Sequence, residues 1–584
     1  MDKNTEVMKE ILHSNYVYQL AKKFLGKDNK KENIYNSEIW YTGKKLEDLL
    51  QANNEQNYKK RYVFDELMKY LTTPANDVCA LYGLRRTGKS VLMRQAIWEL
   101  INEKGISSEA IAYITFNRNT KCTDDVLINN ITKMNEKVKY FFIDEISYID
   151  MDIENNSLNA LADKFTVYGK KIVIAGTFSY AIKLLSKDVL FERLYPINTT
   201  YFSFKEANEL TGISLERFME RGGILTGREE LQLSPDEYME TAVIDNIVNS
   251  LVRSEKLYDI GYLDDKIDKL IDTNNGRKLK LELANLIKLV IDQYLKRLLY
   301  KELVKDLRKN ESYKYSDIGN LKDIMNKRSI REHNIDNSVI VIPNNKKDTK
   351  YYDFIQKEFG SIDNERVSPE IYDKLTNILK EIGLIEDIQL QGETKFCFVT
   401  PYLRFGLCEK LMNKLEEGYS KEFERYGTGI AGEALKGHMQ EVVIYLELKH
   451  SESYYDFDMY KGTKEVDLII KDNNTMEMDL YEIKHSSQIV PEQAKNLIDR
   501  EFIQEVENVM GYTARKLYVI YNGDNAVIEI KPDELFEKLR DDAIQNNQME
   551  LEKKYDTLMK KAQAQKWKNV TINYLNAEKF LLNI

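Results

Sequence analysis

The chain has 584 residues, of which 43% are apolar and 31% are charged, with 8 prolines and 26 glycines. This length exceeds a single small binding module, and the apolar content is sufficient for packed cores, so a disordered or collagen-like polymer is excluded. With 85 basic and 95 acidic residues, the net charge of −10 argues against a protein whose whole surface binds nucleic acid, but it is compatible with a local basic groove.

No segment of the chain is typical of export or of membrane insertion. The amino-terminal residues lack the apolar core of a signal peptide, and no later run approaches the roughly 18 uncharged apolar residues that a membrane span requires. The four cysteines are far apart in sequence and form no Cys-x-x-Cys pair, which argues against a disulfide framework and against a zinc ribbon. We therefore expect a cytoplasmic protein that does not bind membranes.

The first recognisable pattern is an alternation of strands and helices. Residues 1–60 are rich in Lys, Asn and Glu, and we assign them no function. Residues 61–204 contain short, continuous apolar runs, which are typical of strands buried on both faces of a parallel sheet, with helical patterns between them. The apolar runs are 78–82, 111–116, 140–143 and 172–175. This alternation predicts an α/β fold with a parallel sheet.

The first predicted strand leads directly into a glycine-rich loop. The segment Gly83-Leu-Arg-Arg-Thr-Gly-Lys-Ser90 satisfies the phosphate-loop pattern G-x-x-x-x-G-K-[ST], and a helical pattern follows it. In such a loop the glycines let backbone N–H groups turn toward phosphates, the lysine reaches the β- and γ-phosphate oxygens, and the final hydroxyl binds Mg²⁺. We therefore predict a site for ATP and Mg²⁺. The expected ligands are Gly83, Arg86, Thr87, Gly88, Lys89 and Ser90.

Later strands add polar candidates to this site. The run at 140–143 ends in Asp144, which we expect to bind Mg²⁺, and Glu145, which we expect to polarise the attacking water. Thr177 follows another strand and is expected either to sense the γ-phosphate or to cap the next helix. Arg193 is expected either to stabilise charge in the transition state, in its own chain or in a neighbouring subunit of a homo-oligomer, or to form a surface salt bridge.

The middle of the chain changes character twice. Residues 205–310 are helical in pattern, and we expect a helical lid there. Residues 311–365 are irregular and polar, which indicates a linker. Within residues 366–415, a helical pattern at 371–382 precedes a hairpin pattern through 391–398. A helix followed by a two-stranded wing favours a winged-helix-like domain.

Residues 416–540 carry a second candidate site. Two strand-like runs are joined by a polar turn, and Asp467 lies early in the first run. Strand alternation places Glu482 and Lys484 of the second run on one face, where the hairpin brings them beside Asp467. Two carboxylates that converge on a lysine bind a divalent metal and lower the pKa of its water, while the ammonium group orients the nucleophile or offsets charge on a phosphodiester. The alternative is a solvated hairpin without a metal.

Two further features complete this region. A helical pattern at 437–447 places Glu441 where it can bind the same metal. The triplet Glu-x-Lys is common in a chain rich in both residues, and we interpret Glu447-Leu-Lys449 as a chance match. Residues 541–584 are expected to form a C-terminal helical tail.

Together these motifs resemble a family of AAA-type P-loop ATPases, often called archaeal-type, that carry a winged helix and a PD-(D/E)XK nuclease-like domain at the carboxyl end. The resemblance covers roughly residues 60–525. It rests on the phosphate loop at 83–90, Phe-Ile-Asp-Glu at 142–145, Ala-Gly-Thr at 175–177, Tyr-Pro at 195–196, 201–206, 435–441, Glu-Val-Asp at 465–467 and Tyr-Glu-Ile-Lys-His-Ser at 481–486. It implies a nuclease-like site that binds Mg²⁺ or Mn²⁺, with Gln493 as an accessory. The implied site residues are Glu441, Asp467, Glu482 and Lys484.

The leading hypothesis is an ATPase whose nucleotide state controls a metal-dependent nuclease that acts on DNA in bacterial genome or phage defence. A second hypothesis is a nucleotide-dependent switch that binds nucleic acid or protein through a nuclease-like domain without cutting. A third is a plain NTPase whose C-terminal domain only mediates assembly. A metal requirement separates the first hypothesis from the second.

Overall fold

The computed structural model of the chain describes the greater part of the sequence. The described residues are 37–74, 77–117, 122, 124–134, 136–146, 169–176, 193–225, 234–248, 280–284, 287, 376–406, 421–546 and 548–584. The chain divides into two compact units, one made of residues 1–199 and 245–276 and the other of residues 200–244 and 277–584. None of the helices within the described ranges combines the length and the apolar character that a bilayer crossing requires.

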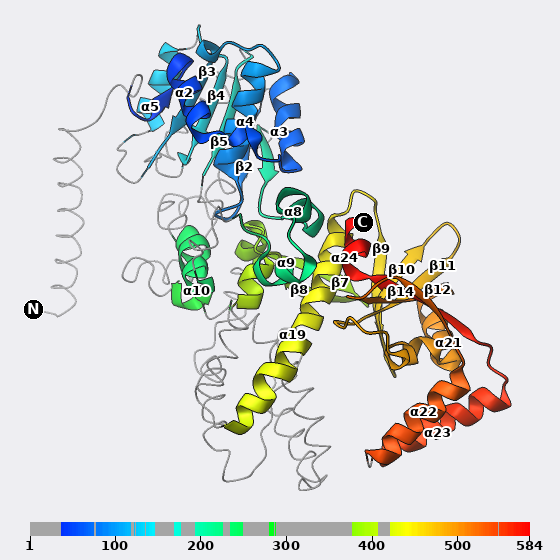
Figure 1. Ribbon diagram of the computed structural model, residues 1–584. Helices are drawn as coiled ribbons and strands as arrows, with labels where there is room; N and C mark the ends of the chain where they lie inside the picture. Colours follow the sequence, from blue (N-terminus) through cyan, green and yellow to red (C-terminus); the bar gives the residue numbers. More distant parts are fainter. Residues whose placement is uncertain are drawn as a thin grey trace, which may run out of the picture. The chain divides into compact units, whose positions relative to one another are not determined.

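The first unit contains a six-stranded sheet flanked by helices (Figure 1). The strand order is β1-β3-β4-β5-β2-β6, and every neighbouring pair is parallel except β1 with β3. The strands are β1 (Trp40–Tyr41), β2 (Val78–Tyr82), β3 (Ile111–Thr115), β4 (Tyr140–Asp144), β5 (Lys171–Ala175) and β6 (Leu194–Asn198). The helices are α2 (Gly43–Asn53), α3 (Val63–Thr72), α4 (Lys89–Asn102) and α5 (Asp124–Lys133). The predicted α/β fold with a parallel sheet is confirmed.

Burial on both faces of this sheet explains why its central strands read as continuous apolar runs. Along β4, Phe141 and Ile143 join one hydrophobic cluster with Leu127 of α5, whereas Phe142 joins the opposite cluster with Leu92 of α4. Successive side chains of a strand point to opposite faces, so a strand covered on both sides needs apolar residues at every position.

Two strands of the first sheet were not predicted. The segment 37–60 supplies β1 and α2, so the ATPase core begins before residue 61 and the assignment of residues 1–60 as a separate extension was wrong for its described part. The other strand, β6, lies at the sheet edge beside β2 and contains Pro196. Proline cannot donate a ladder hydrogen bond and is tolerated at an edge, which hides such a strand from an apolar pattern.

The expected winged-helix region and most of the expected lid belong to the second unit, whereas residues 245–276 of the lid region belong to the first. The lid region contains α8 (Phe204–Thr211), α9 (Leu215–Arg221), α10 (Pro235–Tyr238) and a π-helical turn (Met239–Ile244). A helix at 376–381 precedes an antiparallel hairpin of β7 (Ile385–Leu390) and β8 (Glu393–Phe398), in the order that the sequence indicated. The winged helix itself stays a prediction, because its flanking residues, like the linker at 311–365, lie outside the described residues.

A second six-stranded sheet forms the C-terminal part of this unit. Its order is β13-β14-β12-β11-β10-β9, in which β11–β12 and β12–β14 are parallel pairs and the other pairs are antiparallel. The strands are β9 (Asp456–Lys461), β10 (Glu465–Asp472), β11 (Glu477–Ile483), β12 (Thr513–Tyr521), β13 (Ala526–Ile530) and β14 (Val570–Asn576). The helices are α19 (Lys421–His450), α20 (Lys495–Ile498), α21 (Arg500–Met510), α22 (Pro532–Gln545), α23 (Met549–Ala564) and α24 (Ala577–Leu582).

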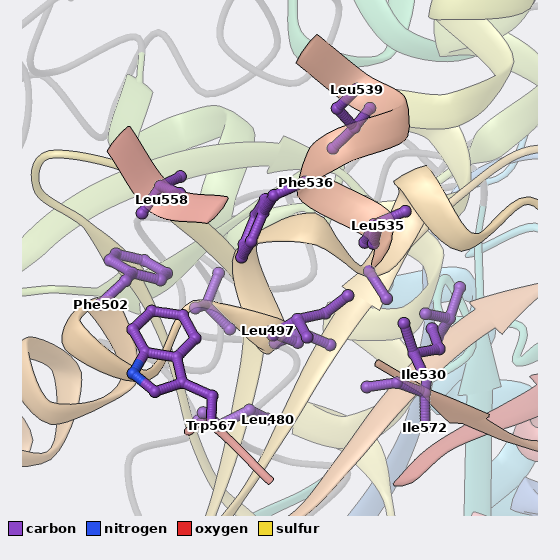
Figure 2. Close-up of a cluster of buried hydrophobic side chains, with 14 of the residues drawn as sticks. Leu480, Leu497, Phe502, Ile530, Leu535, Phe536, Leu539, Leu558, Trp567 and Ile572 are labelled. Atoms are coloured by element: carbon purple, nitrogen blue, oxygen red, sulfur yellow. The ribbon is translucent and has the colours of Figure 1, made fainter. Parts of the chain in front are cut away.

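The expected helical tail at 541–584 was wrong. This segment contains β14, which is inserted between β12 and β13 in the second sheet, and its Ile572 and Tyr574 are fully buried. Figure 2 shows Ile572 in the core with Trp567 and with Leu558 of α23. The alternation of apolar and polar residues along β14 is the period that marks a strand.

Candidate functional site

The phosphate loop connects the end of β2 to the start of α4. Gly83 and Gly88 have φ angles of 144° and 88°, which residues with side chains rarely adopt, and Arg86 also has a positive φ of 63°. Loops that mix left-handed and right-handed residues form concave arrays of N–H groups that bind anions. The loop therefore has the backbone conformation that a phosphate site needs.

Lys89 is buried at the first position of α4 and folds back over the loop. Its Nζ donates to the carbonyl oxygens of Gly83 at 2.9 Å and Leu84 at 2.7 Å. Burial lowers the pKa of Lys89 to about 8, although the carboxylates of Glu145 and Asp144 act in the opposite direction. Anionic phosphate oxygens at this loop favour the charged ammonium, so nucleotide binding and protonation of Lys89 support each other.

Two residues that the sequence analysis did not single out, Thr199 and Arg61, hold the phosphate loop in place. The hydroxyl of Thr87 bonds the Leu84 carbonyl at 2.9 Å and the hydroxyl of Thr199, just after β6, at 2.7 Å. The buried guanidinium of Arg61 donates to the carbonyl oxygens of both threonines at 2.8 Å. Thr87 therefore uses its side chain to anchor the loop, which leaves its backbone N–H as its means of binding phosphate.

Asp144 ends β4, at the same edge of the sheet as the phosphate loop because β4, β5 and β2 are parallel. Its Oδ2 accepts a hydrogen bond from the Tyr113 hydroxyl at 2.7 Å, and its Oδ1 accepts one from the backbone N–H of Glu145 at 3.0 Å. Arg94 of α4 donates to the Tyr113 hydroxyl at 3.1 Å and pairs with Glu55. This chain of contacts fixes the orientation of the buried Asp144 carboxylate.

The residues at this edge fit a magnesium–nucleotide complex. Ser90, half-buried near the start of α4, offers a hydroxyl, and Asp144 offers a carboxylate whose orientation is fixed. Hard oxygen ligands of this kind are those that Mg²⁺ prefers. Glu145 has a φ of 55°, a strained backbone conformation of the kind that clusters at active sites.

Two further predicted residues remain, Thr177 and Arg193. Thr177 lies outside the described residues. Arg193 precedes β6, and its carbonyl accepts the N–H of Val78 at the start of β2. The phosphate loop follows the other end of the five-residue β2, about 16 Å away at roughly 3.3 Å per residue. The structure therefore does not bring Arg193 to the nucleotide site of its own chain, and a role in a neighbouring subunit stays a prediction.

The second site forms where β10 and β11 pair as the hairpin that the sequence predicted. Lys484, directly after β11, donates from Nζ to Asp467 Oδ2 at 2.9 Å and to Glu482 Oε2 at 2.6 Å. The N–H of Ile483 also donates to Asp467 Oδ2 at 2.8 Å. The three predicted residues therefore lie together on one face of the sheet.

Burial and charge set the protonation of this trio. Burial, reinforced by the Asp467 charge, raises the pKa of Glu482 to about 8. Burial alone disfavours the charged ammonium of Lys484, but the two carboxylates outweigh it and raise its pKa. Asn496 of α20, which the sequence analysis missed, donates to Glu482 Oε1 at 3.1 Å and to the Glu465 carbonyl at 3.0 Å. No local motif marks Asn496, because its contact depends on how α20 packs on β10.

The other implied members of this site are placed less directly. The Oε2 atom of Glu441, on α19, lies 3.3 Å from Nδ1 of His438. One helical turn after Glu441, the Tyr445 hydroxyl donates to the backbone carbonyl of Asp467. Gln493 makes hydrogen bonds with residues 488 and 490. Within the described ranges, no three Asp, Glu, His or Cys side chains come together as a metal-ligand group. The role of Glu441 as a metal ligand therefore stays a prediction.

The fold and the loop define the first unit as a P-loop nucleotide-binding domain. The sequence model of the family described as "AAA domain" matches residues 75–208, which span β2 to β6. Residues 75–208 are therefore similar to an AAA domain, and this match supports ATP binding and hydrolysis by that part of the chain. No curated protein sequence matches the chain.

Several solved structures resemble the chain weakly. A DNA polymerase III gamma subunit-related protein of Thermotoga maritima is 13% identical with a TM-score of 0.21, covering 55% of this chain and 98% of its own. AMPPCP-bound DnaA of Aquifex aeolicus is 14% identical with a TM-score of 0.21, covering 55% and 91%. The ORC2 protein of Aeropyrum pernix is 12% identical with a TM-score of 0.26, covering 67% and 98%. Scores at this level carry no argument about function.

Proposed function

We propose that this chain is a Mg²⁺-dependent ATPase whose nucleotide state controls a metal-dependent PD-(D/E)XK-type nuclease that cuts DNA. The observation that carries the nuclease half is the bridging of Asp467 and Glu482 by Lys484, at 2.9 and 2.6 Å. Asp467 lies on β10 and Glu482 on the adjacent strand β11, and Lys484 directly follows β11. The AAA domain and its phosphate loop support the ATPase half.

The phosphate loop suggests a role for each residue in nucleotide hydrolysis. Lys89 would exchange its two loop carbonyls for phosphate oxygens, Asp144 and Ser90 would hold Mg²⁺, and Glu145 would orient the attacking water. In the second site, Asp467 and Glu482 would hold the divalent ion, which lowers the pKa of a bound water. Lys484 then faces the phosphodiester as a positive charge, and Asn496 keeps the Glu482 carboxylate in place.

The test uses the purified full chain with plasmid, linear and single-stranded DNA, in Mg²⁺ or Mn²⁺, with and without ATP. We expect cleavage that is lost in Lys484→Ala. Lys449→Ala is the matched control, because Lys449 belongs to the other Glu-x-Lys triplet and pairs with Glu386 at 2.6 Å. If none of the three DNA forms is cut by the wild-type chain under any of these conditions, the nuclease half is wrong.

One observation favours a second function, a nucleotide-dependent switch that binds nucleic acid without cutting it. Both carboxylate oxygens of Glu482 already have partners, Asn496 and Lys484, and its raised pKa favours the neutral form that does not bind metal. DNA binding that needs no metal and persists in Asp467→Ala, together with intact DNA, supports this second function.

A further inference from the structure

A carboxylate from the lid region lies against the end of β11. Glu216, near the start of α9, accepts a hydrogen bond from Lys436 Nζ at its Oε1, at 2.5 Å, and one from His485 Nε2 at its Oε2, at 2.9 Å. Lys436 is on α19 and His485 directly follows Lys484. α9 packs on α19 in the second unit (Figure 1).

This arrangement has the form of a bound phosphate. Each oxygen of one carboxylate takes a separate donor, as two non-bridging oxygens of a phosphodiester do. The hydrogen bonds from Lys436 and His485 outweigh the effect of burial, so the pKa of Glu216 lies below its ordinary value and the side chain is an anion. An anion of the chain itself therefore occupies a place that two donors define.

The place is next to the candidate nuclease residues. The backbones of Lys484 and His485 are consecutive, about 3.8 Å apart between Cα atoms. The Lys484 side chain lies with the carboxylates on one face of the sheet, whereas the His485 ring reaches Glu216 of α9. α19 passes close to His485, since a Cβ built at Gly437 would lie 3.9 Å from the His485 Cβ, in ordinary van der Waals contact. A DNA backbone that crosses the end of β11 would therefore lie near both Lys484 and His485.

We propose that Lys436 and His485 form a binding site for a backbone phosphate of DNA, and that Glu216 occupies this site until α9 moves away. The proposal rests on the proposed function, because it supplies the substrate anchor of the same nuclease-like domain. Glu216 is 44% exposed, and partly exposed ion pairs add little net stability, so exchange for a phosphate is feasible. The N–H of Leu215 donates to Glu578 of α24 at 3.1 Å, so movement of α9 also breaks this hydrogen bond.

The chain connection supplies a route for nucleotide control. Thr199 bonds Thr87 of the phosphate loop, and the following residues lead directly into α8 and α9. The proposal assigns nucleotide control of Glu216 to this connection.

The test measures the binding of a fluorescein-labelled duplex DNA to the full chain by anisotropy at several salt concentrations. We expect Glu216→Gln to bind about fivefold more tightly than the wild type and to steepen the salt dependence by about one released counterion. Glu534→Gln is the control, because it removes the same charge from another glutamate that pairs with a lysine, Lys531, at 2.7 Å. Adding Lys436→Gln and His485→Gln to the Glu216→Gln variant is expected to abolish the gain.

Equal DNA binding by Glu216→Gln and Glu534→Gln would overturn the proposal, as would a gain that survives loss of Lys436 and His485. ATP hydrolysis and DNA cleavage by the same preparations separate this outcome from failure of the proposed function. If Glu216→Gln binds DNA more tightly but ATP is not hydrolysed and DNA is not cut, the phosphate site is supported and the proposed nuclease is contradicted. If the wild type cuts DNA but Glu216→Gln binds DNA no more tightly, the nuclease is supported and the phosphate site is contradicted.

Discussion

The guanidinium of Arg61 donates to the carbonyl oxygen of Thr87 at 2.8 Å, which ties the phosphate loop to the residue directly before Tyr62, the N-cap of α3. The same Nη1 donates to the carbonyl of Thr199. A single buried cation therefore joins the middle of the loop to the end of β6. The loop conformation depends on a side chain outside the motif that defines it.

We expect Arg61→Ala to weaken ATP binding about tenfold, because the loss of about 1.4 kcal/mol follows when the loop carbonyl has no buried donor. Calorimetric titration with ATP measures the affinity. Lys60→Ala, which removes a neighbouring and more exposed cation that pairs with Glu99, is the control and should bind ATP normally. A folded Arg61→Ala chain with wild-type affinity would show that the loop keeps its conformation without this contact.

Lys89→Ala and Glu145→Gln should separate binding from turnover. Lys89→Ala removes the ammonium that reaches the phosphates, so ATP affinity is expected to fall by at least about tenfold. Glu145→Gln leaves the loop intact and removes the group that orients water, so ATP still binds while hydrolysis falls by about a hundredfold. Titration calorimetry and phosphate release measure the two effects. Normal turnover in both variants would contradict the assignment of the site.

Asn496→Ala tests whether the helix α20 positions the second site. The substitution removes the donor to Glu482 Oε1, and the carboxylate then has only Lys484 to orient it. We expect DNA cleavage to fall about tenfold or more, as is usual for residues that orient metal ligands, with a higher Mn²⁺ concentration needed for half-maximal rate. Asn546→Ala, which removes an exposed amide directly after α22, serves as the comparison. A similar loss in both variants would point to a general disturbance of the domain.

Substitution of Glu447 tests whether the triplet Glu447-Leu-Lys449, which we interpreted as a chance match, has a structural role. Its buried carboxylate accepts hydrogen bonds from the Phe204 N–H at 2.7 Å and from the Tyr201 hydroxyl at 2.9 Å, so it joins α19 to the start of α8. Glu447→Ala leaves both donors buried without an acceptor, and we expect the free energy of unfolding to fall by about 2 kcal/mol. Denaturant titration measures it, and Glu447→Gln, which keeps an acceptor, should lose less.

The same carboxyl predicts a pH dependence with a defined sign. Burial raises the pKa of Glu447 above its ordinary 4.5 in the folded chain. Its stabilising contribution is therefore complete below the unfolded pKa and is lost as the pH rises through the folded one. The difference in unfolding free energy between wild type and Glu447→Gln should shift against the wild type as the pH rises above the ordinary pKa of 4.5. A difference that stays constant as the pH rises would contradict the raised pKa.

The local sequence pattern was sufficient to predict those parts of the fold in which apolar residues follow a single regular pattern. The strands β2 to β5 are buried on both faces and read as apolar runs, and the phosphate loop follows the first of them. The pairing of Asp467 with Glu482 and Lys484 followed from alternation across a hairpin. Neither the edge strand β6, which contains Pro196, nor the inserted strand β14 is a continuous apolar run. The place of each strand in its sheet depends on partners far away in the chain.

The amino-acid sequence alone determined which chemical groups exist: a loop able to hold phosphate, two carboxylates after a buried strand, and a lysine between two acids on a hairpin. Only the tertiary structure decided which distant side chains control them. Arg61 sits behind the loop, Asn496 holds Glu482, and Glu216 faces Lys436 and His485. Hydrogen bonds of this kind join residues with no fixed sequence spacing, because packing of whole helices and strands sets the distance between them.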